Sequence, residues 1–302
     1  QSDKSYPVGI DVRTERTSVD EPFPSGRVAQ PPVGLPGSGV PCIQRFMTSG
    51  GTIFRLSPWR GNSRTTQVVA VDGPPPRPDD VSDLIDYLGS LGVREVMTTA
   101  LGPIDQRSFT ARGFNPQEHL LLMGRPVDPT NPSSRWRSRW TGRTPGRPRT
   151  RPARRHHRDA VLELDNRAFT PFSPFWHFDR AALDEVGQAT ASHRRRVVRQ
   201  RATRWTGSTV IGHAITGRTT TIGFIQRLAV DPTAEGQGVG SALVVDALRW
   251  LRQTGAHEVL VNTQPDNDRA RALYLRHGFT EREGGLDVLH RVIDDPAGDP
   301  VR

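Results

Sequence analysis

The amino-acid sequence predicts a mixed α/β protein made of two tandem copies of a similar unit, the first of them degenerate. Three observations lead to this fold class. Apolar, strand-like runs alternate with amphipathic runs in the second half of the chain, a glycine-rich turn joins one such strand to a helix, and part of this order recurs in the first half. With 302 residues, the chain is long enough for two domains of ordinary size.

Residue periodicity predicts the elements of the second half in order. We expect helices at about 159–169, 179–191, 241–254 and 267–277, and strands near 196–200, 209–216, 221–230, 258–262 and 286–292. Strands that alternate with helices in this way are typical of a mixed sheet covered by helices.

The glycine-rich turn is the most specific feature of this half. Gly236, Gly238 and Gly240 alternate between an apolar strand and an amphipathic run, and they leave little side-chain bulk near the backbone. The start of the following helix offers free N–H groups and the positive end of a dipole. The turn therefore indicates a cradle for a phosphate or pyrophosphate group. Its spacing fits neither the dinucleotide fingerprint nor the P-loop.

Together with its neighbours, this turn resembles the GNAT family of acyl-CoA-dependent N-acetyltransferases. The resemblance is carried by Leu228-Ala-Val-Asp-Pro232, by Gly236-Gln-Gly-Val-Gly240, and by the run from Asn267 through Leu273-Tyr274 to Gly278-Phe279. These pieces span about 50 residues, 228–279, in the family's order. The resemblance implies a splayed sheet in which acyl-CoA lies between two parting strands, with its pantetheine arm along the first of them.

The same resemblance implies the site residues. Tyr274 is expected to act as the general acid that protonates the departing CoA thiolate. The cosubstrate would be acetyl-CoA, with no metal ion required. The residues expected to bind acetyl-CoA are Leu228, Ala229, Val230, Gly236, Gln237, Gly238, Val239, Gly240, Ser241 and Asn267. Asn267 is also a preferred residue for capping the helix that follows it.

The general base is not evident from the sequence. Many family members carry Glu on the first of the parting strands, but here the strand reads Phe224-Ile-Gln-Arg-Leu-Ala-Val230. Arg227 would bind a substrate carboxylate or pair with a neighbouring acid. His213, with an ordinary pKa near 6.5, would act as a base through water or serve only the core. Glu235 stands where the family often has Arg or Gln, and it would repel a pyrophosphate if it pointed inward.

The first half repeats part of this pattern. The run 83–99 follows the order helix, glycine, strand found in 246–262, with Gly92 opposite Gly255, and 107–114 lies over 272–279. In the first copy, Asp72-Gly-Pro-Pro-Pro-Arg-Pro-Asp-Asp80 replaces the glycine turn, and successive prolines remove N–H donors. Phe109 stands opposite Tyr274. We therefore expect a GNAT-like half without a working site, in an arrangement like that of two-domain family members.

These patterns divide the chain into five parts. We predict an irregular tail at 1–40, a degenerate GNAT-like half at 41–130, an Arg/Pro-rich linker at 131–157, a catalytic domain at 158–294 and a second tail at 295–302.

The net charge of +9 comes from one segment of the chain. The segment Arg135–Arg158 holds ten arginines and no acidic residue, and subtracting these ten charges leaves −1 for the remainder. A solvated linker is the expected role of this segment. Binding of single-stranded nucleic acid, with Trp136 and Trp140 stacking on bases, and attraction of an acidic protein substrate are the alternatives.

Other features limit the class of protein. Cys42 is the only cysteine, which argues against an internal disulfide and against a cysteine metal cluster. The chain has no run of eighteen apolar residues and no leader-like start, so we expect a cytoplasmic protein with no membrane partner.

The sequence therefore predicts an acetyl-CoA-dependent N-acetyltransferase that acts on a primary amine of a small molecule or a protein. The aromatic segment Phe169–Phe178 would line the acceptor pocket or pin a loop to the core. A non-catalytic acyl-CoA sensor that docks through the basic linker is the alternative.

Overall fold

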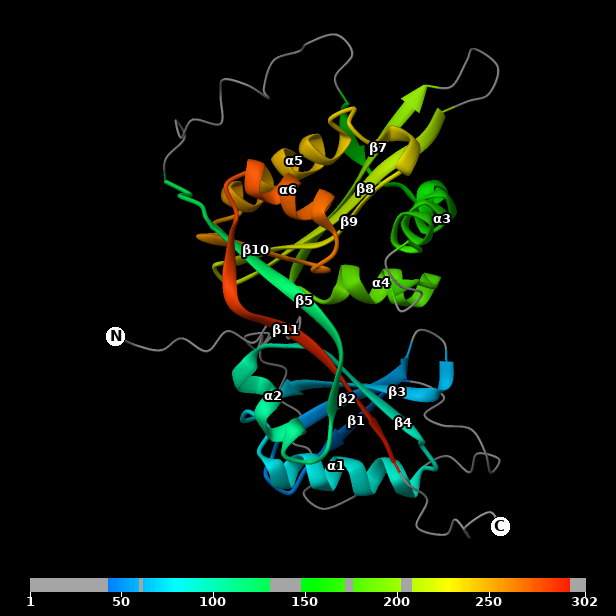
Figure 1. Ribbon diagram of the computed structural model, residues 1–302, viewed down its shortest axis with the longest axis vertical. Coiled ribbons are helices and arrows are strands. Elements are labelled where there is room, and N and C mark those ends of the chain that lie inside the picture. The colour runs from blue at the N-terminus through cyan, green and yellow to red at the C-terminus, as the bar shows by residue number, and fades with distance from the viewer. Residues whose placement is uncertain (1–42, 60–61, 131–147, 172–175, 202–207, 294–302) are drawn as a thin grey trace, which may run out of the picture. The chain divides into compact units, whose positions relative to one another are not determined.

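The computed structural model describes residues 43–59, 62–130, 148–171, 176–201 and 208–293. The chain forms two compact units (Figure 1). Unit 1 takes in the chain up to Glu118 and again from Asp287, and unit 2 comprises His119–Leu286. Both units are mixed α/β structures, as the sequence predicts.

Unit 1 is a sheet with two helices. Its strands are β1 (Gln44–Met47), β2 (Ile53–Trp59), β3 (Asn62–Asp72) and β4 (Glu95–Leu101), followed in the sheet by the last part of β11. β3 and β4 are parallel, and the other neighbours are antiparallel. The helices are α1 (Pro78–Ser90) and α2 (Pro103–Thr110). Apolar residues of both helices pack with strand residues in one core, which includes Phe54, Leu84, Leu88, Phe109 and Phe114.

Unit 2 has a larger sheet, in the order β11-β5-β10-β9-β8-β7-β6. The strands are β5 (Asn115–Pro126), β6 (Thr150–Pro152), β7 (Ser192–Arg201), β8 (Ser208–Thr219), β9 (Ile222–Val230), β10 (Glu258–Thr263) and β11 (Thr280–Val292). The helices are α3 (Arg158–Phe169), α4 (Arg180–Gln188), α5 (Val239–Gln253) and α6 (Asp268–Arg276), with short 3-10 turns η2 (Arg155–His157) and η4 (Pro232–Ala234). The helices and strands from residue 158 onward follow the predicted order.

The helices of unit 2 cover both faces of its sheet (Figure 1). Val197 packs in a core with α3 and α4, whereas its neighbour Val198 packs with the first turns of α5. Because successive strand residues point to opposite faces, α3 and α4 lie on one face and α5 on the other. The sheet thus separates the glycine-rich turn before α5 from the α3 and α4 layer.

The internal repeat is visible in the element order. β3, α1, β4, α2 and β5 recur as β9, α5, β10, α6 and β11. Gly92 and Gly255 both have positive φ, 72° and 90°, at the turn after the first helix of each copy. Gly113 and Gly278 likewise have φ of 78° and 77° after the second helix. Only glycine adopts these angles without strain, which explains why the four positions repeat.

The two copies exchange their last strands. β5 ends the first copy but pairs antiparallel with β10 of the second, with Leu260 opposite Gly124. β11 ends the second copy but pairs antiparallel with β4 of the first, with Val288 opposite Ala100. The compact units therefore follow strand pairing, whereas the boundaries predicted at 41–130 and 158–294 follow the order of the repeats.

Candidate functional site

The strands β9 and β10 separate from each other, as the predicted splayed sheet requires. The parallel pairing runs from Ile222 opposite Glu258 to Phe224 opposite Leu260 and goes no further. β9 continues to Val230 and β10 to Thr263. The backbone of β9 that includes Leu228, Ala229 and Val230 thus lies beyond the ladder to β10, so its polar groups on that side are not used by β10.

The glycine-rich turn follows directly from this part of β9. The side chain of Asp231 accepts a hydrogen bond from the Thr233 backbone N–H at 2.9 Å, which starts the η4 turn. Gly236 and Gly238 then have φ of 72° and 78°, and Gly238 is the N-cap of α5. A side chain at either glycine would be strained in this left-handed conformation.

The start of α5 is suited to an anion. The first backbone hydrogen bond of the helix runs from the Ala242 N–H to the Gly238 carbonyl at 3.0 Å. The N–H groups of Val239, Gly240 and Ser241 therefore precede the helical ladder. No acidic residue lies in the first turn. These N–H groups and the positive end of the helix dipole favour a negatively charged group such as a pyrophosphate.

Glu235 does not leave an uncompensated charge beside this turn. Its carboxylate forms an ion pair with Arg269 in the first turn of α6. Both side chains are partly or largely exposed, so the pair is a weak one in energy. It nevertheless places a cation next to the carboxylate that the sequence suggested would repel a pyrophosphate.

Gly240 allows α5 to approach α6. A Cβ atom at this position would lie 3.0 Å from Cδ2 of Leu273 and 3.6 Å from Cγ2 of Val230. A larger side chain would therefore push α6 or the end of β9 away from α5. Val239 and Ser241 on either side are buried, whereas Gln237 is exposed and its amide donates to the Thr233 carbonyl at 3.1 Å.

α6 carries the remaining two predicted residues. The side chain of Asn267 caps the helix, as predicted, by accepting from the Ala270 N–H at 3.0 Å. Tyr274 is buried and packs edge-on against Phe279, with ring centroids 5.6 Å apart. Burial raises the pKa of the Tyr274 phenol above its ordinary value, so the hydroxyl stays protonated at neutral pH. A protonated hydroxyl is the form that a general acid needs.

Arg227 is engaged within the protein core. Its Nη2 lies 2.6 Å from Oδ2 of Asp165 and donates to the Trp176 carbonyl at 2.9 Å. The guanidinium carbon lies 3.6 Å and 4.0 Å from the ring centroids of Phe169 and Phe178. Arg227 thus pairs with a neighbouring acid, the second of the two predicted alternatives, and the two phenylalanines that bound the aromatic segment pack against it.

His213 shares the same carboxylate. Its Nε2 lies 2.7 Å from Oδ1 of Asp165, and both residues are almost completely buried. Burial by itself would raise the pKa of Asp165, but the charge of Arg227 and the hydrogen bond from His213 outweigh it and hold the pKa below its ordinary range. Asp165 is not among the residues predicted from the sequence. Its only signal is an acidic residue beside Leu164 on the apolar stripe of a predicted helix.

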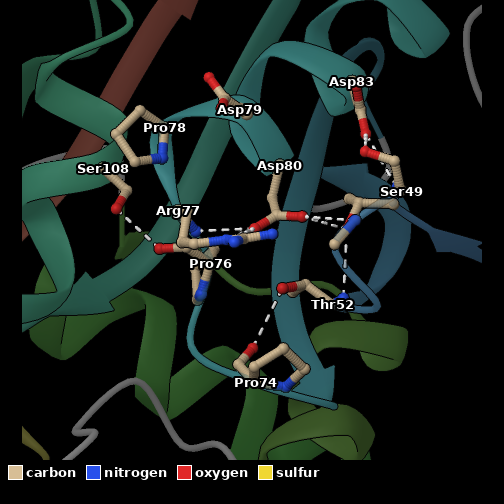
Figure 2. Close-up of polar contacts among 12 residues, drawn as sticks. Ser49, Thr52, Pro74, Pro76, Arg77, Pro78, Asp79, Asp80, Asp83 and Ser108 are labelled. Atoms are coloured by element: carbon tan, nitrogen blue, oxygen red, sulfur yellow. Dashed lines mark hydrogen bonds and ion pairs between the residues drawn. The ribbon is translucent and has the colours of Figure 1, made fainter.

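The corresponding turn of the first copy is filled by its own side chains (Figure 2). Asp80, in the first turn of α1, is 1% exposed. Its carboxylate accepts from the Thr48 hydroxyl at 2.5 Å and from the backbone N–H groups of Arg77 and Gly50 at 2.9 and 3.1 Å. A carboxylate of the protein thus occupies backbone N–H donors near the start of α1. The preceding Pro74, Pro75 and Pro76 have no N–H groups to offer.

Other predicted features lie partly or wholly outside the described residues. Most of the arginine-rich segment falls in residues 131–147, so the suggested nucleic-acid role of Arg135–Arg158 stays a prediction. Among the described residues, no group of three or more His, Cys, Asp or Glu side chains is placed to hold a metal ion. In the same part of the chain, no helix is both long and apolar enough to cross a membrane.

Comparison with known proteins agrees with this geometry. Residues 158–279, from the start of α3 to the residue before β11, match the acetyltransferase (GNAT) family. This part of the chain is a GNAT acetyltransferase domain. The parting strands, the glycine turn and α6 all lie within or at the border of the matched range.

Relatives of the chain include proteins named mycothiol acetyltransferase. The protein of that name from Amycolatopsis mediterranei is 30% identical over 141 residues, which are 41% of this chain and 43% of the relative. The one from Beutenbergia cavernae is 48% identical over 58 residues, 19% of this chain and 20% of the relative. The matches span less than half the length of these relatives.

Solved structures match the fold over more of the chain than the GNAT domain alone. A tandem GNAT protein from the clavulanic acid biosynthesis pathway superposes with a TM-score of 0.57 at 15% identity, covering 82% of this chain and 81% of the other. FemX superposes with a TM-score of 0.51 at 10% identity, covering 84% and 89%. At these identities the likeness concerns the fold alone, and it covers more of the chain than the GNAT match does.

Proposed function

We propose that unit 2 binds acetyl-CoA and transfers its acetyl group to a primary amine by direct attack. The observation that carries this proposal is the coincidence of the parted end of β9 with the N–H groups of Val239, Gly240 and Ser241 in the GNAT domain. Those N–H groups would bind the pyrophosphate, and the edge of β9 at Leu228 and Val230 that does not pair with β10 would bind the pantetheine arm.

Tyr274 would serve as the general acid. In direct transfer the amine nitrogen bonds to the thioester carbonyl carbon, the carbon–sulfur bond breaks, and the sulfur leaves with the electron pair. The Tyr274 hydroxyl would donate its proton to that sulfur, since a phenol is protonated at neutral pH. Arg227 and His213 are both bound to Asp165, so we propose that the amine loses its proton to water.

We propose the acceptor only by its chemical class, a primary amine. Because relatives of the chain are named mycothiol acetyltransferases, their substrates are the first amines to test. Other small amines, antibiotics, protein amino termini and lysine side chains complete the screen. We also propose that the protein acts in the cytoplasm.

Titration calorimetry with acetyl-CoA tests the cradle. The parent protein is expected to bind at one site per chain, and Gly238→Glu is expected to abolish binding because it adds bulk and negative charge at the start of α5. Gly255→Glu is the matched control, since Gly255 also has positive φ, 90°, and lies just beyond the other end of α5 in open space. Absence of binding by the folded parent would overturn the proposal.

A second candidate function is a non-catalytic acyl-CoA sensor. It is favoured by two features: β9 carries no acidic residue, and His213 of β8 is bound to Asp165. Tyr274→Phe separates the two functions. In an enzyme, this change should lower turnover by roughly 10²–10⁴ while acetyl-CoA still binds. A parent that binds acetyl-CoA but acetylates no amine in the screen would favour the sensor. Tyr87→Phe, which removes a hydroxyl from α1, is the control.

A further inference from the structure

Unit 2 contains a second concave site, on the face of the sheet that carries α3 and α4. It is a cavity of about 370 Å³ bounded by η2, the start of α3, α4, β7 and β8. Val161, Leu183 and Ile215 form its apolar lining. None of the residues proposed to bind acetyl-CoA is among those that line this cavity, so we treat it as a separate site.

A buried histidine in this cavity has an unused hydrogen-bond donor. His157 is 6% exposed, and its Nδ1 accepts from the Arg154 backbone N–H at 3.0 Å. A neutral imidazole that accepts at Nδ1 carries its proton on Nε2. Nε2 is buried and has no hydrogen-bond partner among the described residues. A buried donor without a partner is unfavourable, so a ligand that accepts from it would be favoured.

The neutral state of His157 follows from its surroundings. Burial lowers the pKa of its imidazole below the ordinary value, and the positive charges of His156, Arg199 and Arg154 lower it further. At neutral pH the ring therefore stays uncharged and donates through Nε2.

Cations surround the cavity. Arg158 and Arg195 both pair with Asp184, and Arg196 pairs with Asp246. Arg154 and Arg155 are exposed at η2, and no carboxylate partner is found for them in the described part of the chain. The charge of the rim is thus only partly neutralised within the protein.

We propose that this cavity binds a small organic anion, a carboxylate or phosphate on an apolar body, which accepts from His157 Nε2 and pairs with Arg154 and Arg155. Guanidinium groups recognise both kinds of anion through paired N–H donors. Val161, Leu183 and Ile215 would contact the apolar body.

Binding of three probes of similar shape tests this proposal. Benzoate and phenyl phosphate are titrated into the full chain by calorimetry or NMR, with neutral benzamide as the control for charge. We expect saturable binding of at least one anion and none of benzamide. The stronger of the two anions identifies the head group. Absence of saturable binding of both anions, or equal binding of benzamide, would overturn the proposal.

Variants then locate the site. The double change Arg154→Gln and Arg155→Gln is expected to weaken binding about tenfold or more, because it removes two guanidinium groups that would pair with the anion. His157→Asn retains an acceptor for the Arg154 N–H but lacks the Nε2 donor, and it should weaken binding similarly. Arg107→Gln, on an exposed arginine of α2, should have no effect.

The proposed acetyl-CoA site is tested separately. Gly238→Glu should leave anion binding unchanged, whether or not the parent binds acetyl-CoA. Anion binding that survives the arginine double change but is lost in Gly238→Glu would overturn the proposal by placing the anion at the start of α5.

Discussion

Asp165 of α3 and Arg227 of β9 form a buried ion pair, with 2.6 Å between Oδ2 and Nη2. Their side chains are 0% and 7% exposed. The pair joins the helix layer to the strand whose far end parts from β10, and His213 of β8 binds the same carboxylate. One buried acid thus fixes three elements around the start of the parted segment.

Removing one partner of this pair is expected to destabilise the protein strongly. Arg227→Met should lower the free energy of unfolding by about 3–5 kcal/mol, because it leaves Asp165 as a buried charge with one remaining partner. Urea unfolding measures the change. Arg180→Gln is the control, since its pair with Asp159 is 67% exposed on both sides and should be worth less than about 1 kcal/mol. Equal effects of the two changes would contradict the structural role of Arg227.

Asp80 is expected to stabilise unit 1. Asp80→Ala should cost about 3 kcal/mol in urea unfolding, because the donors of Thr48, Gly50 and Arg77 lose their acceptor. Its neighbour Asp79 is 88% exposed and pairs with Arg112, so Asp79→Ala should change stability by less than about 1 kcal/mol. Neither change should alter acetyl-CoA affinity. A gain of a second acetyl-CoA site in Asp80→Ala would show that this carboxylate alone closes the first copy.

The conformation of Gly236 gives a prediction about the glycine turn. Gly236→Ala should lower the free energy of unfolding by about 1–2 kcal/mol, because φ is 72° and a Cβ disfavours the left-handed region. Space is not the limit, since a Cβ here would meet no atom within 4 Å. Gly236→Asn should cost less, as Asn tolerates this region better. Stability of Gly236→Ala equal to the parent would mean that the turn relaxes freely.

His277 makes stability depend on pH. Burial, with the charges of Arg125 and Arg276, lowers the pKa of its imidazole to about 4 in the folded protein, against an ordinary value near 6.5. Between these values the unfolded chain binds more protons, so stability is full above pH 6.5 and falls as the pH drops toward about 4. The loss should reach about 3 kcal/mol.

Urea unfolding across this pH range compares the parent with His277→Asn. The variant should lose less stability on acidification. Some dependence should remain, because burial also lowers the pKa values of His157 and His193. An unchanged pH dependence in His277→Asn would show that another group is responsible.

Local sequence determined much of this protein. The glycine turn at Gly236–Gly240, the cap at Asn267 and the order of helices and strands from α3 to β11 were predictable, because periodicity, caps and positive φ depend on neighbours along the chain. The repeat of Gly92 at Gly255 was also visible in the sequence. The proline-rich turn of the first copy was also predicted to offer few N–H donors, because proline has none.

Only the tertiary structure decided which distant groups meet. Asp165, His213 and Arg227 lie on three elements, and their contact depends on how α3 packs over β8 and β9. The exchange of β5 and β11 between the two copies likewise depends on which strand edge each one meets after the chain leaves its own repeat. A strand's own residues specify that it pairs and which face it buries, but backbone hydrogen bonds are alike at every edge, so its partner is chosen by long-range packing.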